Sequence, residues 1–245
     1  MKKTAGLSKN QEKLLSILEY KKLIFITRNE LITIINKYID VKNANKLILS
    51  MIKKNRLKSI IKAKYLVIPM RAINKKWTLS ESEIIKFLMG DSQYYFGLGT
   101  AFNQHHFTEQ IPNKLFIFNS KYSYNKHILN YYIKMIKIKK SRLFGFSNSD
   151  YPSSDKERTI IDALKYSSYL GGLDSVLDIL KNIKFNQKKL EKYAIRYNSI
   201  KIIKLIGMIT DSSKLYKYLK KNKKLYYTSI KGIEKKNKKW KIIPN

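Results

Sequence analysis

The chain has 245 residues, of which 44% are apolar, and it carries 51 basic and 17 acidic side chains, a net charge of +34. This apolar content can bury a core, so we expect a folded rather than a disordered chain. The absence of cysteine excludes disulfides, thiolate zinc sites and a cysteine nucleophile. Lysines interrupt every apolar run near the N-terminus, and no run reaches the length of a membrane span. We therefore expect a soluble, cytoplasmic protein with no membrane partner.

The positive charge indicates a polyanionic partner. Lysine is overused and arginine occurs only six times, which is also the signature of an A+T-rich genome, so part of the charge reflects codon bias. The net charge is nevertheless +15 over residues 1–80, +9 over 81–210 and +10 over the last 35 residues. Codon bias alone would not concentrate charge at the ends of a chain. We expect nucleic acid rather than a membrane surface as the partner.

Three helices are expected in the first part of the chain. Residues 8–20 space their leucines along one helical face. Thr27, followed three residues later by Glu30, forms a capping box at the start of a second helix. A third helix is expected to begin at Asp40. Two short capped helices separated by a brief turn are typical of a helix-turn-helix.

A basic hairpin is expected directly after these helices. Leu57–Ile61 and Tyr65–Ile68 have the pattern of short strands, joined by Lys62-Ala63-Lys64 and closed by Pro69. A helix pair followed by such a hairpin predicts a winged helix-turn-helix, in which the third helix is the recognition helix.

Polar side chains of this region are the expected contacts to double-stranded DNA. Asparagine can pair with adenine in the major groove, and lysine can reach guanine or phosphate. The expected DNA-contacting residues are Thr27, Arg28, Lys42, Asn43, Asn45, Lys46, Ser50, Lys53, Lys58, Lys62 and Lys64. The alternative is that they form only the solvated face of an amphipathic helix, but the basic hairpin favours DNA contact.

The rest of the chain predicts an α+β domain with strands early and helices late. Ser80 and Glu83 have capping-box spacing at the start of its first helix. A short helix over Thr100–His106 is expected to precede strands over Lys114–Phe118, Asn130–Ile138 and Arg142–Phe146, and four helices over about 156–168, 173–182, 187–197 and 200–210. We expect the basic tail to fold back with Trp240 at least half buried, because apolar residues recur among its lysines.

The predicted fold class is therefore α+β with two domains. A winged helix-turn-helix over residues 1–70 is followed by a connector over 71–79. A larger, mostly helical α+β domain occupies residues 80–245.

Several short motifs follow one another along the chain. They are Tyr65–Pro69, Tyr94–His106 leading to Gln110-Ile111-Pro112, Ser154–Asp162 followed by Gly171-Gly172, Leu205-Ile206-Gly207, and Trp240 near the last asparagine. The most specific is Glu157-Arg158-Thr159 with Asp162 downstream. In this order the motifs resemble the AbiEi family, the antitoxin half of bacterial and archaeal type IV toxin–antitoxin pairs. The chain departs from the family where Ala63 stands in a wing turn that usually carries glycine, and at His106-Phe107 in place of His-Gly.

The resemblance implies a function for each half of the chain. The N-terminal domain would repress its own operon by binding operator DNA as monomers that pair on inverted repeats. The C-terminal domain, with the motif residues Glu157, Arg158, Thr159 and Asp162, would act as the antitoxin. It would counter a nucleotidyltransferase-like toxin, either by direct contact or by undoing the toxin's effect.

The residues themselves favour structure over catalysis. Ser154 and Glu157 have capping-box spacing, and Arg158 and Asp162 are spaced as an ion pair on one helix. Adjacent histidines point about 100° apart on a helix and cannot share one metal ion, so we expect no metal site and no cofactor. Phosphate-binding loops and nucleophile elbows are absent, so we expect no enzyme. Two alternatives stay open: a stand-alone winged-helix transcriptional regulator without a toxin partner, and a nucleic-acid-processing enzyme whose site is not recognised.

Overall fold

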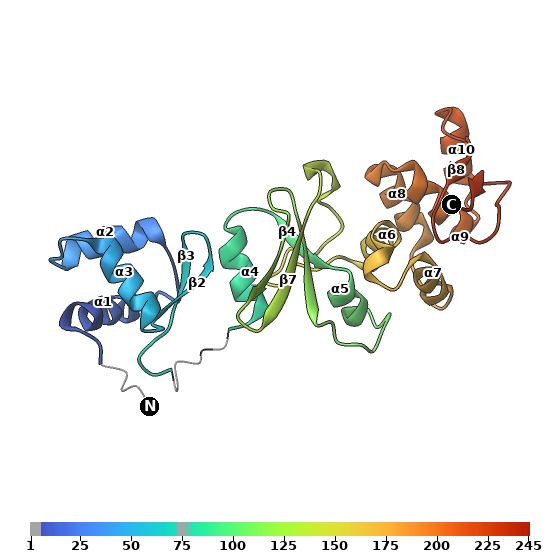
Figure 1. The fold of residues 1–245 in the computed structure, drawn as a ribbon. Helices are drawn as coiled ribbons and strands as arrows, with labels where there is room; N and C mark the ends of the chain where they lie inside the picture. The colour runs from blue at the N-terminus through green and yellow to red at the C-terminus, as the bar shows by residue number, and fades with distance from the viewer. Residues whose placement is uncertain (1–5, 73–76, 78) are drawn as a thin grey trace. The chain divides into compact units, whose positions relative to one another are not determined.

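Helices and strands are mixed along the computed structural model, which describes residues 6–72, 77 and 79–245 (Figure 1). The predicted α+β class is confirmed. The chain divides into two compact units, Met1–Leu88 and Met89–Asn245. The division thus falls at the last residue of the helix Glu81–Met89. The sequence prediction placed a connector at 71–79, of which residues 73–76 and 78 lie outside the described part. No helix among the described residues is both long and apolar enough to cross a membrane.

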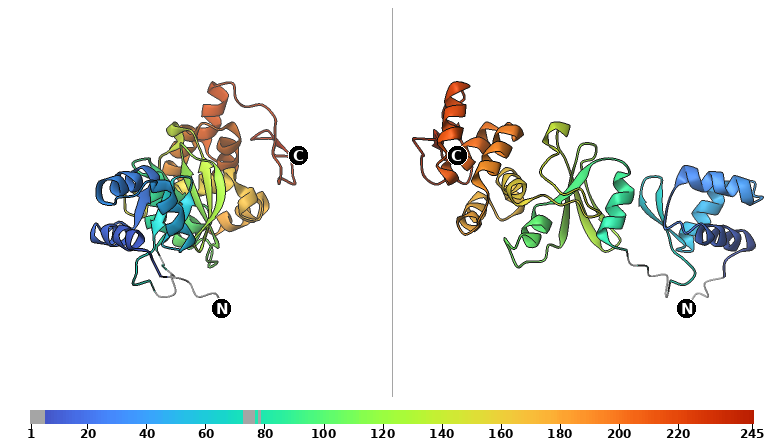
Figure 2. Two further views of the ribbon diagram at one scale, coloured as in Figure 1. Left: turned by 60° about the vertical axis from the view of Figure 1, so that its left-hand side comes forward. Right: turned by 180° about the vertical axis from the view of Figure 1, so that it is seen from behind.

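The N-terminal unit begins with three helices that lie together in every view (Figure 2). They are α1 Lys9–Tyr20, α2 Arg28–Tyr38 and α3 Ala44–Lys53. Their apolar faces form a common core, in which Leu14, Leu31 and Met51 are fully buried. The capping box at the start of α2 is confirmed, because the Thr27 hydroxyl accepts from the Glu30 amide and the Glu30 carboxylate accepts from the Thr27 amide.

The start of α3 differs from the prediction. The helix begins at Ala44 and not at Asp40, because the Asn43 side chain is its cap. The Asn43 backbone is extended, and its Oδ1 accepts a hydrogen bond of 3.1 Å from the Lys46 amide. Lys42 and Asn43 therefore precede the helix.

A three-stranded antiparallel sheet completes this part of the unit. Its strands β1 Phe25–Thr27, β2 Leu57–Ile61 and β3 Lys64–Val67 lie in the order β1–β3–β2. The predicted hairpin is confirmed to within one residue. In its turn Ala63 has a φ of 61°, the left-handed conformation that glycine adopts at no steric cost. Next in the chain, α4 Glu81–Met89 starts at the predicted capping box, in which Ser80 N donates to Glu83 Oε2 over 2.9 Å.

The C-terminal unit opens with a four-stranded sheet in the order β4–β5–β7–β6. Its strands are β4 Tyr94–Gly97, β5 Lys114–Asn119, β6 Tyr124–Ile128 and β7 Tyr131–Lys137, and the short helix α5 Gly99–Gln104 follows β4. All neighbouring pairs are antiparallel except β5 and β7, which are parallel.

The strand predicted over Arg142–Phe146 is not formed. Lys140–Arg142 is a 3-10 turn, η2, and Phe146 makes only an isolated bridge to Ser154. The reason is Gly145, whose φ of 73° interrupts an extended chain and whose missing Cβ leaves space for the Tyr193 ring.

Helices make up most of the remaining chain. They are α6 Lys156–Lys165, the 3-10 turn η3 Ser167–Tyr169, α7 Leu173–Lys181, α8 Gln187–Tyr197, α9 Ile200–Thr210 and α10 Ser213–Lys221. The four predicted helices correspond to α6–α9. Helix α10 lies in the segment predicted as a basic tail, and Ser212 caps it by accepting from the Leu215 amide over 3.1 Å.

The tail folds back on the helices, as predicted. Strands β8 Thr228–Ser229 and β9 Ile242–Ile243 pair in parallel. Trp240 is only 1% exposed and lies against Gly207 of α9, where a Cβ would overlap the indole ring. Lys204 of α9 is also buried, and its ammonium donates to Thr228 Oγ1 over 2.6 Å and to the backbone carbonyls of Tyr226 and Lys241.

Candidate nucleic-acid interface

Arg28, the first residue of α2, joins two of the segments predicted to contact DNA. Its backbone amide donates to the carbonyl of Ala63 in the hairpin turn over 2.8 Å. Its guanidinium Nη2 donates to Asn45 Oδ1 near the start of α3, also over 2.8 Å. The start of α2, the first turn of α3 and the tip of the hairpin therefore form one surface.

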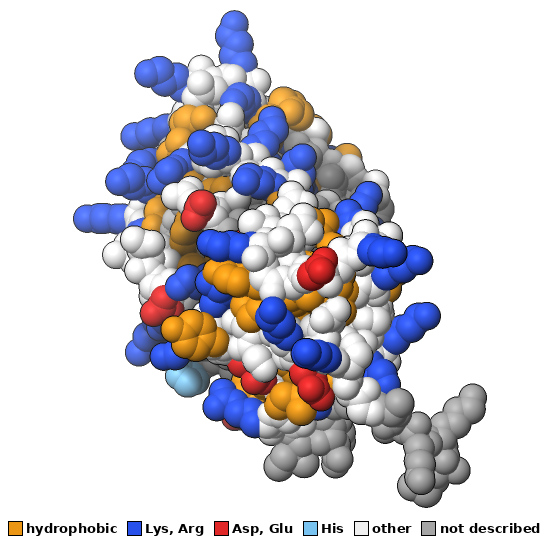
Figure 3. All heavy atoms as spheres, turned by 90° about the vertical axis from the view of Figure 1, so that its left-hand side faces the viewer, with side chains coloured by type: hydrophobic (Ala, Val, Ile, Leu, Met, Phe, Trp, Pro, Cys, Tyr) orange, Lys and Arg blue, Asp and Glu red, His pale blue; other side chains and the backbone are white. Residues whose placement is uncertain are grey.

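Most of the predicted contact residues are exposed on this unit. The exposed ones are Arg28, Lys42, Asn43, Asn45, Lys46, Lys53, Lys58 and Lys62. Lysine and arginine side chains project over much of the surface seen in Figure 3, with a few acidic side chains among them. Among the described residues the Asn45 side-chain nitrogen donates no hydrogen bond, and its oxygen has a second lone pair, so this side chain can still pair with a base edge.

Besides Arg28 and Asn45, four of the predicted contact residues make side-chain contacts inside the unit. Thr27 and Asn43 use their side-chain oxygens as helix caps. Ser50 was expected on the outward face of the third helix, but it points toward α1, where it accepts from Gln11 Nε2 over 2.9 Å. Gln11 is itself buried, so this bond fixes α3 against α1.

Lys64 is the fourth engaged residue. Its ammonium donates to the carbonyls of Phe87 and Leu88 over 3.0 and 3.2 Å, and lies 4.9 Å from the centre of the Phe87 ring. These carbonyls are at the end of α4, where a cation is favourable. Lys64 thus links the hairpin to α4, and the hairpin presents Lys58 and Lys62 to solvent.

The motif of α6 forms a buried ionic cluster in the C-terminal unit. The predicted ion pair between Arg158 and Asp162 is confirmed, and both side chains are 0% exposed. Arg158 donates from Nε to Asp162 Oδ2 over 3.0 Å and from Nη2 to Oδ1 over 2.9 Å, the two-pronged geometry that suits guanidinium and carboxylate. Tyr95 of β4 donates its hydroxyl to Asp162 over 2.8 Å and accepts from Arg158 over 2.6 Å.

The positive charge of Arg158 and the negative charge of Asp162 are paired inside this cluster. Burial favours the neutral form of Arg158, but Asp162 and Tyr95 outweigh it and raise the pKa of the guanidinium. Burial raises the pKa of the Asp162 carboxyl, while Arg158 and the Tyr95 hydroxyl oppose that rise. The remaining guanidinium nitrogen, Nη1, donates to the carbonyl of Arg142 over 2.7 Å. This arrangement fixes β4, η2 and α6 to one another.

The expected capping box of Ser154 and Glu157 is not formed. Asp155 is the cap, because its Oδ1 accepts from the Arg158 amide over 2.9 Å. Glu157 accepts instead from the Asn186 amide and from Lys189 Nζ, each over 2.9 Å. Burial raises the pKa of Glu157, but these two donors outweigh it, so the pKa is lowered.

The motif side chains do not form a surface. Glu157 is 5% exposed, and Arg158, Thr159 and Asp162 are fully buried. A partner molecule could not touch the last three without local unfolding. Sequence reasoning recognised the Arg158–Asp162 spacing but missed Tyr95, because no local pattern joins residues 67 positions apart. In the described part of the chain, no group of three or more acidic or histidine side chains is placed to hold a metal ion.

Comparison with known proteins gives a fold relationship. No protein-family model matches the chain, and no curated protein matches it. Among solved structures, the RV2827C protein from Mycobacterium tuberculosis is similar, with a TM-score of 0.64 and 10% sequence identity. The match covers 97% of this chain and 92% of that chain. At this identity the likeness concerns the fold alone.

Proposed function

We propose that the N-terminal unit is a winged helix-turn-helix that binds double-stranded DNA, with α3 as the recognition helix and the β2–β3 hairpin as the wing. The observation that carries the proposal is the contact of Arg28 with both Ala63 and Asn45. It brings the hairpin tip and the first turn of α3 onto one cationic surface. A duplex could then contact both elements at once.

The exposed side chains divide by the part of DNA that they fit. Lys62 at the hairpin tip and Arg28 suit phosphates, where they release counterions and give affinity without sequence preference. Asn45 and Lys46, in the first turn of α3, suit base edges in the major groove. Asn43 has a different role, because its oxygen already caps the helix.

Repression and toxin neutralisation complete the proposal. The resemblance to the AbiEi family supports repression of the protein's own operon and an antitoxin role for the C-terminal unit. The burial of Arg158, Thr159 and Asp162 supports a structural part for these residues, which hold the fold that would oppose the toxin. A direct toxin contact would have to use exposed residues elsewhere on the unit.

Salt-dependent binding to labelled duplexes tests the DNA proposal. Lys62→Ala should weaken binding to all duplexes alike and lower the slope of log K against log salt by about one. Asn45→Ala should relax base preference at one operator position, a loss of about 1–3 kcal/mol. Lys13→Ala on α1 is the matched control, because Lys13 is also exposed but lies outside α3 and the hairpin. Equal effects of Lys13→Ala and Lys62→Ala would contradict the proposed surface.

The two roles can be separated in the full-length chain. Cells carrying a neighbouring nucleotidyltransferase-like toxin should be rescued by the Asn45→Ala/Lys62→Ala variant, although that variant no longer represses a reporter fused to the operator. Repression without rescue by the unaltered protein would favour a stand-alone regulator. Metal-dependent degradation of labelled DNA or RNA by the purified protein would favour a nucleic-acid-processing enzyme.

A further inference from the structure

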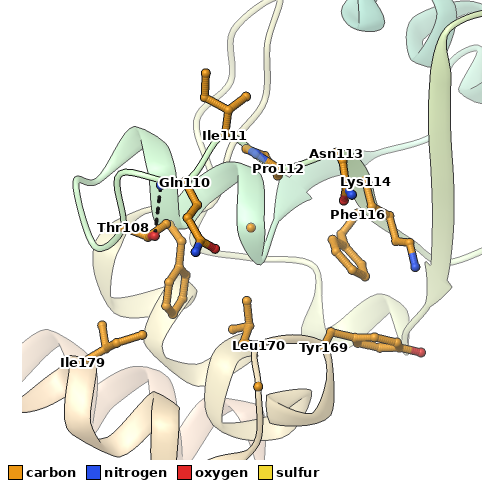
Figure 4. Close-up of a pocket in the computed structure, with 13 residues that line it drawn as sticks. Thr108, Gln110, Ile111, Pro112, Asn113, Lys114, Phe116, Tyr169, Leu170 and Ile179 are labelled. Atoms are coloured by element: carbon orange, nitrogen blue, oxygen red, sulfur yellow. Dashed lines mark hydrogen bonds between the residues drawn. The ribbon is translucent and has the colours of Figure 1, made fainter.

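A hollow of about 610 Å³ opens on the C-terminal unit beside the sheet (Figure 4). Its walls come from the loop between α5 and β5, from the start of β5, and from the turn between α6 and α7. Phe102, Leu170 and Ile179 provide apolar lining. The volume is within the range of about 300–1,000 Å³ in which proteins bind small molecules.

The electrostatics of the hollow favour an anion. None of the residues that line it is acidic, and Lys114 at the start of β5 is its charged residue. Strand pairing sets Tyr132 opposite Lys114, and Lys134 opposite Phe116, on the same face of the sheet. Within the described ranges neither lysine is paired with a carboxylate. One uncompensated ammonium group, that of Lys114, therefore lines the hollow, and a second, that of Lys134, lies beside the wall residues Phe116 and Tyr169.

Aromatic rings accompany both ammonium groups. Lys114 Nζ is 4.5 Å from the centre of the Tyr132 ring, and Lys134 Nζ is 5.7 Å from that of Tyr169. Tyr169 lies 5.1 Å from Phe116, centre to centre, in the wall of the hollow. Tyr132 and Tyr169 are 37% and 41% exposed, so their rings remain available for stacking. Cations beside exposed rings suit a planar group that carries negative charge.

Side-chain amides complete the lining. The backbone of Gln110 is held at both polar groups: its amide donates to Thr108 Oγ1 over 3.2 Å, and its carbonyl accepts from Asn103 Nδ2 over 3.3 Å. The Gln110 side chain points into the hollow (Figure 4). Across the described chain, the side-chain amides of Gln110 and Asn113 have no hydrogen-bond partner. A fixed backbone with free amides can pair with the edge of a heterocycle.

We propose that this hollow binds a nucleotide, with its phosphate at Lys114 and Lys134 and its base against Phe116 and Tyr169. Gln110 and Asn113 contact the edge of the base. A free mononucleotide and a nucleotide within a single strand of nucleic acid share this chemistry. The site is separate from the duplex-binding surface proposed for the N-terminal unit and does not depend on it.

Isothermal titration calorimetry on the full chain tests the site with 5′-AMP, 5′-UMP and a single-stranded pentanucleotide. At least one of the three should bind with one site per chain. If the free nucleotide is the ligand, adenosine and inorganic phosphate should each bind more weakly than 5′-AMP. Lys114→Gln should weaken that binding by about tenfold or more, because it removes a charge-assisted contact to phosphate. Tyr169→Ala should weaken it as well. Lys114 is partly exposed and Tyr169 is exposed, so both variants should fold. Circular dichroism checks that they do.

Lys126→Gln is the matched control, because Lys126 is exposed on β6 and pairs with Ile133, on the other face of the sheet. It should change binding by less than about twofold. Binding of the mononucleotides identifies the free nucleotide as the ligand, and binding of the pentanucleotide alone identifies a strand, provided that Lys114→Gln weakens it. The proposal is overturned if the unaltered protein binds none of the three. It is equally overturned if Lys114→Gln and Lys126→Gln have the same effect.

Discussion

Replacing Asp162 with asparagine would leave the Arg158 guanidinium charged in a part of the core that water does not reach. Both side chains are fully buried, and two N–H···O bonds of 2.9 and 3.0 Å join them. An asparagine could accept from one of these donors but would bring no negative charge. Removing one partner of such a pair costs about 3–5 kcal/mol. Domains are stable by about 5–15 kcal/mol in total, so this loss is a large fraction of the stability of the C-terminal unit.

A double replacement separates the charge effect from the loss of packing. Arg158→Met together with Asp162→Leu removes both charges and leaves apolar side chains of similar bulk. It should destabilise the unit by less than the sum of the two single changes, with a coupling of about 2 kcal/mol or more. Tyr95→Phe removes only a hydroxyl that donates to Asp162, and it should cost about 1–2 kcal/mol.

Urea unfolding at neutral pH measures these losses. Trp240 fluorescence reports on the C-terminal unit if Trp77 is replaced by phenylalanine in every variant. The reasoning would be refuted if Asp162→Asn changed the free energy of unfolding by less than about 1 kcal/mol, or if the single effects added in the double variant. Loss of toxin neutralisation without any loss of stability would instead assign the pair to partner contact.

Three further predictions concern single positions. Ala63→Gly should change stability by less than about 0.5 kcal/mol while Ala63→Val lowers it by about 1–2 kcal/mol in thermal unfolding, because the turn is left-handed; equal effects would speak against that conformation. Gly207→Ala should destabilise the protein by about 1–3 kcal/mol and shift Trp240 fluorescence, since a Cβ would overlap the indole. At a helical position without this crowding the same Gly→Ala change would stabilise the protein, so a gain in stability would contradict the contact. Burial and, to a lesser extent, Lys241 lower the pKa of Lys204 to about 8, below its ordinary 10.5. Between pH 8 and 10.5 the unfolded chain therefore binds more protons at Lys204 than the folded chain, so the urea midpoint should rise with pH in this range. Lys204→Met should flatten that rise. An unchanged dependence of the midpoint on pH in the variant would reject Lys204 as its source.

The elements that local patterns determine could be predicted. The helices of both units have periodic apolar faces, and Thr27 with Glu30 forms the capping box that their spacing indicates. The β2–β3 hairpin is also local, since its strands are adjacent in the chain. The ion pair of Arg158 and Asp162 belongs to the same class, because i,i+4 spacing on a helix brings two side chains together.

Elements that depend on distant partners could not be predicted. Strand β1 has three residues and exists because β3 pairs with it some forty positions later. The α3 cap was misplaced because Asp40 and Asn43 are both good caps, and only the folded chain distinguishes them. Ser50 and Lys64 were predicted to face solvent, because no local pattern indicates their partners, Gln11 for Ser50 and the end of α4 for Lys64.

The candidate nucleotide site illustrates the same limit. Its amides, lysines and rings come from a loop, two strands and a turn that the sequence separates. No local sequence pattern pairs Tyr169 with Lys134, which lie far apart in the chain and come together only in the fold. The parallel register of β5 and β7 is what brings these groups to one edge.

The contact between Gly207 and Trp240 also bears on the order in which the C-terminal unit folds. Helix α9 can form early, because its hydrogen bonds are local and form within microseconds. The space beside Gly207 is filled only by Trp240, which follows α10 and the lysine-rich segment in the chain. The loop between Gly207 and Trp240 must close, at a cost in chain entropy, before the contacts that offset this cost can form. The tail should therefore dock late. Until it does, the apolar residues of α9 remain open to water or to other chains, and the rate of refolding should follow the closure of the tail rather than the formation of the helices.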